Sequence, residues 1–460
     1  MRTMRYYITF SVLLVTLSGP VSAQVGPQGL VPFKDFIQSV PAADFGKYLT
    51  RSTSRVKTAG SFEQMRRHLL NLYQGVEVSH SFLLDSRPFD CVPVAQQPSV
   101  RLLGLKSIAP PPQSAAPGEP QGASHLAEES ATSAPQLGPA AQVDEFGNSV
   151  HCEAHTIPVR RITLEELSRF DTLQQFFEKG PAGAGRPLTQ GQAIPPAFAG
   201  HKYAYTIQYV NNLGGSSTLN LWRPYVRTNL GQVFSLSQEW YVGGTGANTQ
   251  TVEGGWQNFP GKYGTENSVL FIYWTADNYN RTGCYNLDCA AFVQTNNNWY
   301  LGGTFSRYST YGGAQYDFTL KWYLYQGNWW LQLAWLNQAA QWVGYYPGSI
   351  YRGGQLARNA QLIEYGGVVT AVPRLAPSSL NCTRMTPTLS EAVADTVTTV
   401  PDTVVPLAGA VRDTVGGAAS DVPGAPEITP AVAASRASML APMSVPSVAA
   451  FLYVLEAARR

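Results

Sequence analysis

The chain has 460 residues, of which 44% are hydrophobic and only 13% are charged, a composition that suits folded domains with a poorly charged interior. This length allows two or three domains. The formal net charge of +2 gives no electrostatic reason to expect a nucleic acid or a membrane surface as a partner, so we expect neither.

The N-terminus has the three-part pattern of a secretory signal peptide. Arg2 and Arg5 precede an apolar run at 7–17, and Val21-Ser22-Ala23 offers a cleavage site of small residues. The apolar run is too short to span a bilayer. We therefore expect residues 1–23 to be a signal peptide and the protein to be secreted, which permits disulfides.

The N-terminal third reads as short helices. Amphipathic helices are predicted at 31–49 and 61–73, and the second begins with Ser61 and Gln64 at capping-box spacing. A further capping box opens a helix predicted at 163–178.

Two segments of low complexity interrupt this region. Residues 109–141 are dense in Pro, Ala, Ser and Gly and cannot bury enough surface to offset chain entropy, so a disordered linker is expected. A second Pro- and Gly-rich stretch at 180–200 separates the region from the chain that follows. The residues at 371–460 are also of low complexity, and we expect a disordered tail.

The five cysteines suggest two disulfides. Cys91 and Cys152 lie on either side of the linker, and we favour a bond between them, although Cys382 leaves other pairings open. Cys284 and Cys289 lie close together with no His or further Cys nearby. This spacing favours a small structural loop closed by a disulfide over a zinc site.

Residues 201–369 alternate between apolar and polar side chains, with Gly and Asn turns at short intervals. The pattern predicts an all-β domain, an antiparallel β-sandwich, preceded by a small α+β region. The predicted strands span 203–210, 218–222, 233–242, 250–256, 269–274, 290–294, 316–325, 329–334, 341–345 and 361–369. All ten tryptophans fall between Trp222 and Trp342. Core packing explains them, with a substrate-lining aromatic cleft as the alternative.

The β region offers few catalytic groups. No histidine follows His201, so a Ser-His pair, a Cys-His pair or a His-ligated zinc cannot be built within it, and we expect neither a metal nor a cofactor. Among its carboxylates, Glu253 and Glu364 lie in predicted strands next to paired glycines. A charge there is costly unless it is used or paired, and burial is expected to raise the pKa of Glu253. The alternative is an edge-strand glutamate that faces water.

Several segments resemble the neprosin family of secreted glutamic peptidases. The clearest are VEGGW at 252–256, IYWTADNY at 272–279 and GCYNLDCAAFVQ at 283–294. In the N-terminal region, DCV at 90–92 and TIPVRR at 156–161 are similar to the pro-domain of that family. Further similar segments are HKYA at 201–204, FSLSQ at 234–238, Gln97-Pro98, GNWW at 327–330, GYYP at 344–347 and IEYGG at 363–367.

The resemblance implies a zymogen. A pro-domain, here residues 24–195, would be removed under acidic conditions to leave a β-sandwich endopeptidase, residues 196–370, which cleaves after proline with two glutamates. Its substrates would be proline-containing proteins or peptides, and its own pro-domain would be a partner. Trp256, Trp274 and Tyr365 are the residues that we expect to contact the substrate.

The first catalytic glutamate of the family matches Glu253. The second falls in a Glu-Trp-Gly-Gly-Glu pattern, which reads Glu364, Tyr365, Gly366, Gly367 and Val368 here. We assign the role to Glu364 and expect its carboxylate within about 6 Å of that of Glu253, on an adjacent strand, with Val368 packing beside it.

Two alternatives stay open. If the position of Val368 is the catalytic one, the chain is a catalytically impaired neprosin-like protein. Paired acids in a cleft rich in Trp would also fit a carbohydrate-binding or glycoside-cleaving sandwich.

Overall fold

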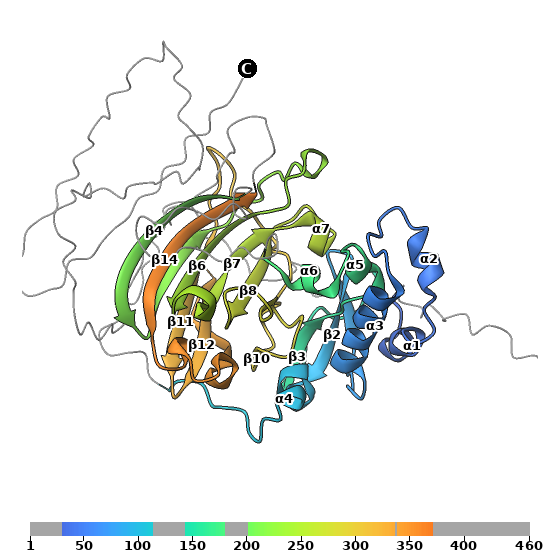
Figure 1. The fold of residues 1–460 in the computed structure, drawn as a ribbon, viewed down its shortest axis with the longest axis horizontal. Coiled ribbons are helices and arrows are strands. Elements are labelled where there is room, and N and C mark those ends of the chain that lie inside the picture. Colours follow the sequence, from blue (N-terminus) through green and yellow to red (C-terminus); the bar gives the residue numbers. More distant parts are fainter. Residues whose placement is uncertain (1–29, 114–142, 180–200, 336–337, 371–460) are drawn as a thin grey trace, which may run out of the picture.

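The computed structural model describes residues 30–113, 143–179, 201–335 and 338–370 (Figure 1). The described residues do not include the predicted signal peptide, the stretch at 180–200, the tail with Cys382 or the linker from Ser114 onward. The first five residues of the predicted linker are described, and Ala109 donates its N–H to the Tyr345 hydroxyl at 3.0 Å.

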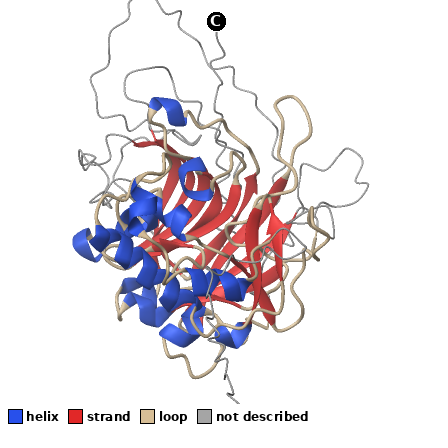
Figure 2. Cartoon of the chain, turned by 90° about the vertical axis from the view of Figure 1, so that its right-hand side faces the viewer, coloured by secondary structure: helices blue, strands red, loops and turns tan. Residues whose placement is uncertain are grey.

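The β region forms two antiparallel sheets packed face to face, and the helices gather to one side of them (Figure 2). This confirms an all-β sandwich preceded by a small α+β region. The six-stranded sheet has the order β4 (His201–Asn212), β14 (Ala360–Thr370), β6 (Ser235–Gly243), β7 (Gln250–Asn258), β8 (Val269–Thr275) and β9 (Cys284–Tyr285). The five-stranded sheet has the order β10 (Val293–Gln294), β13 (Gln341–Pro347), β12 (Asn328–Trp335), β11 (Asp317–Tyr325) and β5 (Gly214–Asn220).

Each of the ten predicted strands overlaps one observed strand. The strand predicted at 290–294 shrinks to the two residues of β10. The short strand β9 was not predicted, because two residues show no alternation that a sequence could reveal.

The core between the sheets is built largely from aromatic rings. Eight of the ten tryptophans are buried, as core packing predicts. Gly254 allows the sheets to approach closely, because a Cβ there would lie 2.9 Å from Leu320 Cδ1 and 3.2 Å from Trp322 Nε1.

The N-terminal region combines helices with a three-stranded antiparallel sheet. The sheet has the order β1 (Ser81–Leu84), β2 (Arg87–Pro93) and β3 (Thr156–Arg160). The helices of this region are α1 (Phe33–Ser39), α2 (Phe45–Leu49), α3 (Ala59–Tyr73), α4 (Pro98–Leu102), α5 (Leu164–Ser168) and α6 (Leu173–Phe177). One further short helix, α7 (Pro260–Tyr263), belongs to the β region.

Three helix predictions are corrected. The helix predicted at 31–49 is two helices, α1 and α2, and the helix predicted at 163–178 is also two, α5 and α6. Thr163 does cap α5, with its Oγ1 accepting from the Glu166 N–H at 3.1 Å. Helix α3 starts two residues before Ser61, because Thr58 caps it by accepting from the Ser61 N–H at 3.1 Å.

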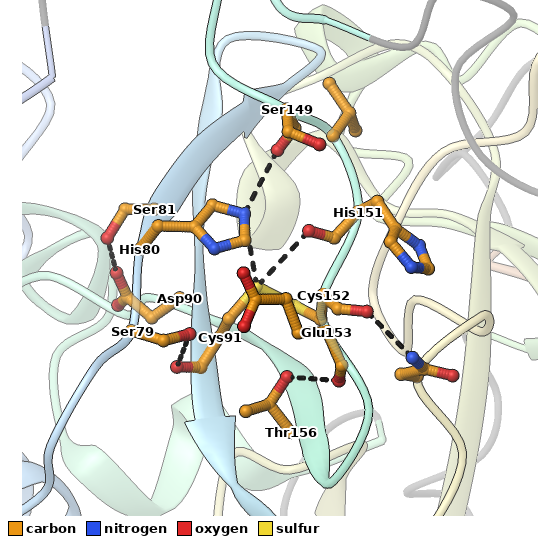
Figure 3. Close-up of a disulfide and its surroundings, with 12 residues drawn as sticks. Ser79, His80, Ser81, Asp90, Cys91, Ser149, His151, Cys152, Glu153 and Thr156 are labelled. Atoms are coloured by element: carbon orange, nitrogen blue, oxygen red, sulfur yellow. Dashed lines mark hydrogen bonds between the residues drawn. A yellow bond between two sulfur atoms is a disulfide. The ribbon is translucent and has the colours of Figure 1, made fainter.

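Both expected disulfides are present. Cys91 in β2 is bonded to Cys152, which precedes β3, so the bond joins the two parts of the chain that flank the linker (Figure 3). His80 lies over this bond and its Nε2 contacts the Ser149 carbonyl oxygen at 3.2 Å. The second bond joins Cys284 to Cys289 at the β9 edge of the six-stranded sheet.

Glu239 of β6 points into the core between the sheets. It is fully buried, and its carboxyl group accepts hydrogen bonds from Ser217 Oγ at 2.6 Å and from the Tyr241 hydroxyl at 3.1 Å. Burial raises the pKa of Glu239 well above its ordinary value, and these two hydrogen bonds offset only part of that effect.

This buried carboxyl group predicts a pH-dependent stability. Because its folded-state pKa is raised, its contribution is complete below the ordinary value of 4.5 and falls as the pH rises towards the folded-state pKa. We expect the stability of Glu239→Gln to rise relative to that of the parent protein between pH 4.5 and pH 7, because only the parent has a buried carboxyl group that ionises less readily than in the unfolded chain.

Urea unfolding of the full chain at the two pH values measures this gain. Glu145→Gln, at an exposed position, is the matched control and should track the parent at both pH values. A Glu239→Gln variant that also tracks the parent would show that this carboxyl group is ionised in the folded protein.

Candidate active site

Glu253 and Glu364 lie on the outer face of the six-stranded sheet, turned away from the other sheet. Glu253 of β7 is paired with Trp240 of β6, and Trp240 is paired with Glu364 of β14. Directly paired residues point to the same face, and Gly254, the neighbour of Glu253, faces the core. The three side chains therefore form one row across the sheet, which we call the glutamate row. Both glutamates are 1% exposed.

The carboxylate of Glu253 is held by hydrogen bonds on both oxygens. Thr251 Oγ1 and the Tyr279 hydroxyl each donate to Oε1 at 2.7 Å. Gln238 Nε2 donates to Oε2 at 3.2 Å, and the Lys179 ammonium forms an ion pair with the same oxygen. Lys179 comes from the end of the N-terminal region, two residues after α6.

The pKa of Glu253 moves in the opposite direction to the one expected. Burial raises it, but the adjacent Lys179 ammonium and the hydrogen bonds from Tyr279 and Thr251 outweigh burial, so the pKa lies below its ordinary value. The expectation of a raised pKa rested on burial alone and did not foresee a cation from a distant part of the chain. In the intact chain Glu253 is therefore an anion.

A strained loop positions the Tyr279 hydroxyl. Asn278 and Tyr279 both have a positive φ, of 57° and 60°, which is uncommon for residues other than glycine. The Asp277 carboxylate stabilises the loop by accepting from the backbone N–H groups of Arg281 at 3.1 Å and Thr282 at 3.0 Å. Burial raises the pKa of Tyr279 well above its ordinary value, so its hydroxyl remains a hydrogen-bond donor.

Glu364, and not Val368, shares the row with Glu253. Val368 is paired with Leu236, which is paired with Gln257. Gln257 lies four residues after Glu253 in β7, so the row of Gly255 separates Val368 from the glutamate row. Val368 is buried in the apolar cluster that includes Leu236, Phe234 and Phe271. The two glutamates are not on adjacent strands, however, because β6 lies between β7 and β14. That expectation was wrong, and the carboxylate separation of about 6 Å stays a prediction.

Trp256, Trp274 and Tyr365 do not share the face of the glutamate row. All three point into the core between the sheets, where Trp256 Nε1 donates to the Asn220 carbonyl oxygen at 2.9 Å. Alternation along a strand explains this, because Tyr365 directly follows Glu364 and Trp256 is an odd number of residues from Glu253. Their expected contact with substrate is corrected to a role in the core.

The residues that do line the site were not predicted from the sequence. They are Lys179, Gln238, Thr251, Phe271, Tyr273 and Tyr279. The alternation of side chains along a strand could have identified four of them, namely Gln238, Thr251, Phe271 and Tyr273. Gln238 shares a face with Trp240, Thr251 shares a face with Glu253, and Phe271 shares a face with Tyr273. Lys179 and Tyr279 reach the site from outside the sheet, and no period in the sequence marks them.

The cysteine loop connects the sandwich to the N-terminal region. The carboxylate of Asp288, inside the loop, pairs with Lys262 Nζ at 2.9 Å and with Arg160 Nη2 at 3.3 Å. His68 Nε2 lies 2.9 Å from the Asp288 carbonyl oxygen. Gln97 adds a second connection, because its side-chain amide bonds to both the carbonyl oxygen and the N–H of Gln294, at 2.9 and 2.8 Å.

Within the described ranges, no group of three or more His, Cys, Asp or Glu side chains is arranged to hold a metal ion. Of the helices described, none has both the length and the apolarity that crossing a bilayer requires.

The fold and the site together define an antiparallel β-sandwich that carries a pair of buried glutamates on one outer face. Residues 231–386 match the family model of Neprosin, a range that includes Glu253, Glu364 and the cysteine loop. This match supports membership of the neprosin family. That family is associated with peptidase activity. The match therefore suggests a peptidase-like function for this chain, with proteins or peptides as substrates.

The hydrogen bond from Tyr279 gives a prediction for the site. Tyr279→Phe removes a donor to an ionised carboxylate, an interaction worth roughly 1.5–3 kcal/mol, so we expect the pKa of Glu253 to rise by about one to two units. Titration of 13C-labelled glutamate by NMR, with Glu253 assigned from the spectrum of Glu253→Gln, measures the shift. Tyr311→Phe, which changes a tyrosine that is 86% exposed, should leave the pKa of Glu253 unchanged. An unchanged pKa in Tyr279→Phe as well would rule out this hydrogen bond.

Proposed function

We propose that this chain is a secreted glutamic endopeptidase, made as a zymogen, that hydrolyses peptide bonds at acidic pH and cleaves after proline. The observation that carries the proposal is the glutamate row, in which Glu253 and Glu364 lie in one row across the sheet and are both buried. The preference for proline rests on the family resemblance. In this proposal residues 24–195 are the pro-domain and 196–370 the peptidase domain.

The mechanism requires a water molecule between the two carboxyl groups. Glu253 and Glu364 are two strand spacings apart, which places their Cα atoms roughly 10 Å from each other. The side chain of Trp240 stands between them in the row, so in this proposal the two carboxyl groups reach past its ring and hold one water between them. The ionised carboxylate takes a proton from the water as it attacks the peptide carbonyl carbon, and the protonated partner donates its proton to the leaving nitrogen.

This mechanism requires an acidic medium. Two close carboxyl groups do not both ionise readily, so one of them holds its proton above the ordinary pKa range of glutamate. The Lys179 ammonium favours the anion of Glu253 in the intact chain. Departure of this cation removes the largest influence that lowers the pKa of Glu253, which allows the two groups to share a proton.

The catalytic pair predicts a large loss of activity on neutral substitution. After acid treatment, we expect Glu253→Gln and Glu364→Gln each to cleave a proline-containing peptide at pH 4 at least about 100-fold more slowly than the parent, the lower limit for loss of a general acid or base. Glu266→Gln, at an exposed position, is the matched control and should retain the parent rate.

Two results would contradict the proposal. Either glutamine variant cleaving as fast as the parent would remove that residue from the mechanism. Release of reducing sugar from a polysaccharide, without cleavage of any peptide, would favour the glycoside-cleaving alternative.

The contacts of the N-terminal region support its role as a pro-domain. The end of this region places Lys179 against Glu253, where a substrate would have to bind. Gln97 and His68 attach the same region to β10 and to the cysteine loop. Such a region blocks the site for as long as it stays bound.

His68 makes this attachment sensitive to acid. Burial lowers the pKa of His68 from 6.5 to about 4, while its contact with Asp288 opposes that shift and Lys262 adds to it. A depressed folded-state pKa means that the attachment is at full strength above pH 6.5 and weakens as the pH falls towards 4. At pH 5 the loss is on the order of 2 kcal/mol.

Processing in acid tests both points. Held at pH 4, the secreted chain should shorten by about the mass of the pro-domain and gain activity. His68→Gln keeps a neutral donor that does not titrate, so it should shorten more slowly than the parent at pH 5, whereas the exposed His151→Gln should not differ from the parent. Full activity without any shortening would show a permanent accessory domain, and equal rates for His68→Gln and the parent would exclude His68 as the sensor.

A further inference from the structure

The ammonium of Lys179 occupies a pocket that the sheet itself builds. The side chain of Lys179 is 9% exposed, and its Nζ hydrogen-bonds to Gln238 Oε1 and to Glu253 Oε2. The rings of Phe271 and Tyr273 lie on the other side, with centroids 5.2 and 5.7 Å from Nζ. Two oxygen acceptors and two aromatic rings are the groups that bind a desolvated cation.

Gly255 creates the space for this cation. In its row of the sheet, Gly255 of β7 lies between Gln238 of β6 and Phe271 of β8. A Cβ on Gly255 would lie 2.0 Å from the Ser237 carbonyl oxygen, so only glycine fits here and no side chain of this residue fills the space between Gln238 and Phe271. The gap is therefore a permanent feature of the sheet and remains when Lys179 leaves.

The four residues that line the gap are themselves buried. Glu253 and Tyr273 are each 1% exposed, Gln238 is 3% exposed and Phe271 is fully buried. All four belong to β6, β7 and β8, whose pairing with one another does not involve Lys179. The backbone that carries these four side chains is thus held by the pairing of β6, β7 and β8.

We propose that these residues form a binding pocket for primary alkylammonium groups, filled by Lys179 in the intact chain and open to the ammonium of a lysine side chain after Lys179 has left. An ammonium bound there sits on Glu253, so a peptide that places a lysine in the pocket blocks the site instead of being cleaved. This last consequence rests on the proposed function, whereas binding of the cation does not.

The geometry allows a test by chemical rescue in the full chain. Lys179→Ala leaves the Cβ and removes three carbons and the nitrogen, so n-propylammonium fits the vacated space. Lys179→Gly removes one carbon more, so n-butylammonium fits. We expect the melting temperature of each variant to rise with millimolar concentrations of its matched amine. The amine that raises the melting temperature most should be one carbon longer for Lys179→Gly than for Lys179→Ala.

Four controls isolate the pocket. The parent protein, in which Lys179 fills the space, and Lys57→Ala, at an exposed position, should bind propylammonium at least tenfold more weakly. 1-Propanol, which has the same length and no charge, should not raise the melting temperature of Lys179→Ala. Adding Glu253→Gln to Lys179→Ala should weaken amine binding by roughly 10- to 100-fold, as expected for loss of a charged hydrogen-bond partner.

The readout does not depend on catalysis, so the two proposals fail separately. Equal amine binding by Lys179→Ala, Lys57→Ala and the parent, or the same preferred amine length for the Ala and Gly variants, would overturn the pocket. Loss of peptide cleavage in Glu253→Gln would still stand as support for the catalytic role. If one Lys179 variant fails to fold, the other still decides, because each has its own matched amine.

Discussion

The burial of the Glu253 carboxylate is the constraint on which the site depends. An ion buried in this way is stable only if neighbouring groups replace the water it has lost, and here a cation, an amide and two hydroxyl groups do so. The cation comes from the N-terminal region, and the other three groups come from the β region. When Lys179 is withdrawn, three donors remain but the compensating charge is gone. The contact that would block the site in the proposed zymogen is thus also the one whose loss raises the pKa of Glu253.

Acid acts in opposite directions on two buried carboxyl groups of the sandwich and on a buried histidine of the N-terminal region. The sandwich encloses Glu239, which is most stable when it is protonated, and Asp317, whose pKa burial raises to about 6. The attachment of the N-terminal region includes His68, which is most stable when it is neutral. A fall in pH therefore favours the buried, protonated forms of Glu239 and Asp317, while it weakens the attachment at His68. This difference in sign suits a protein whose N-terminal region is to be lost in acid while the remainder works there.

The alternation of side chains was sufficient to predict the sandwich but not its site. It located all the long strands, and the glycines next to Glu253 and Glu364 marked both acids. It could not order the strands, so the insertion of β6 between β7 and β14 was missed. Parity, applied more strictly, would have assigned Trp256 and Tyr365 to the core. Lys179 lies 74 residues before Glu253, and only the folded chain brings the two together.

The most direct test of the catalytic pair is a crystal structure of the acid-processed protein at pH 4. The mechanism predicts that Lys179 has left, that the carboxyl groups of Glu253 and Glu364 lie within about 6 Å of each other and that one water is hydrogen-bonded to both. Carboxyl groups more than about 8 Å apart, with Glu364 turned to solvent and no shared water, would contradict it, since a water hydrogen-bonded to two oxygens spans less than about 6 Å.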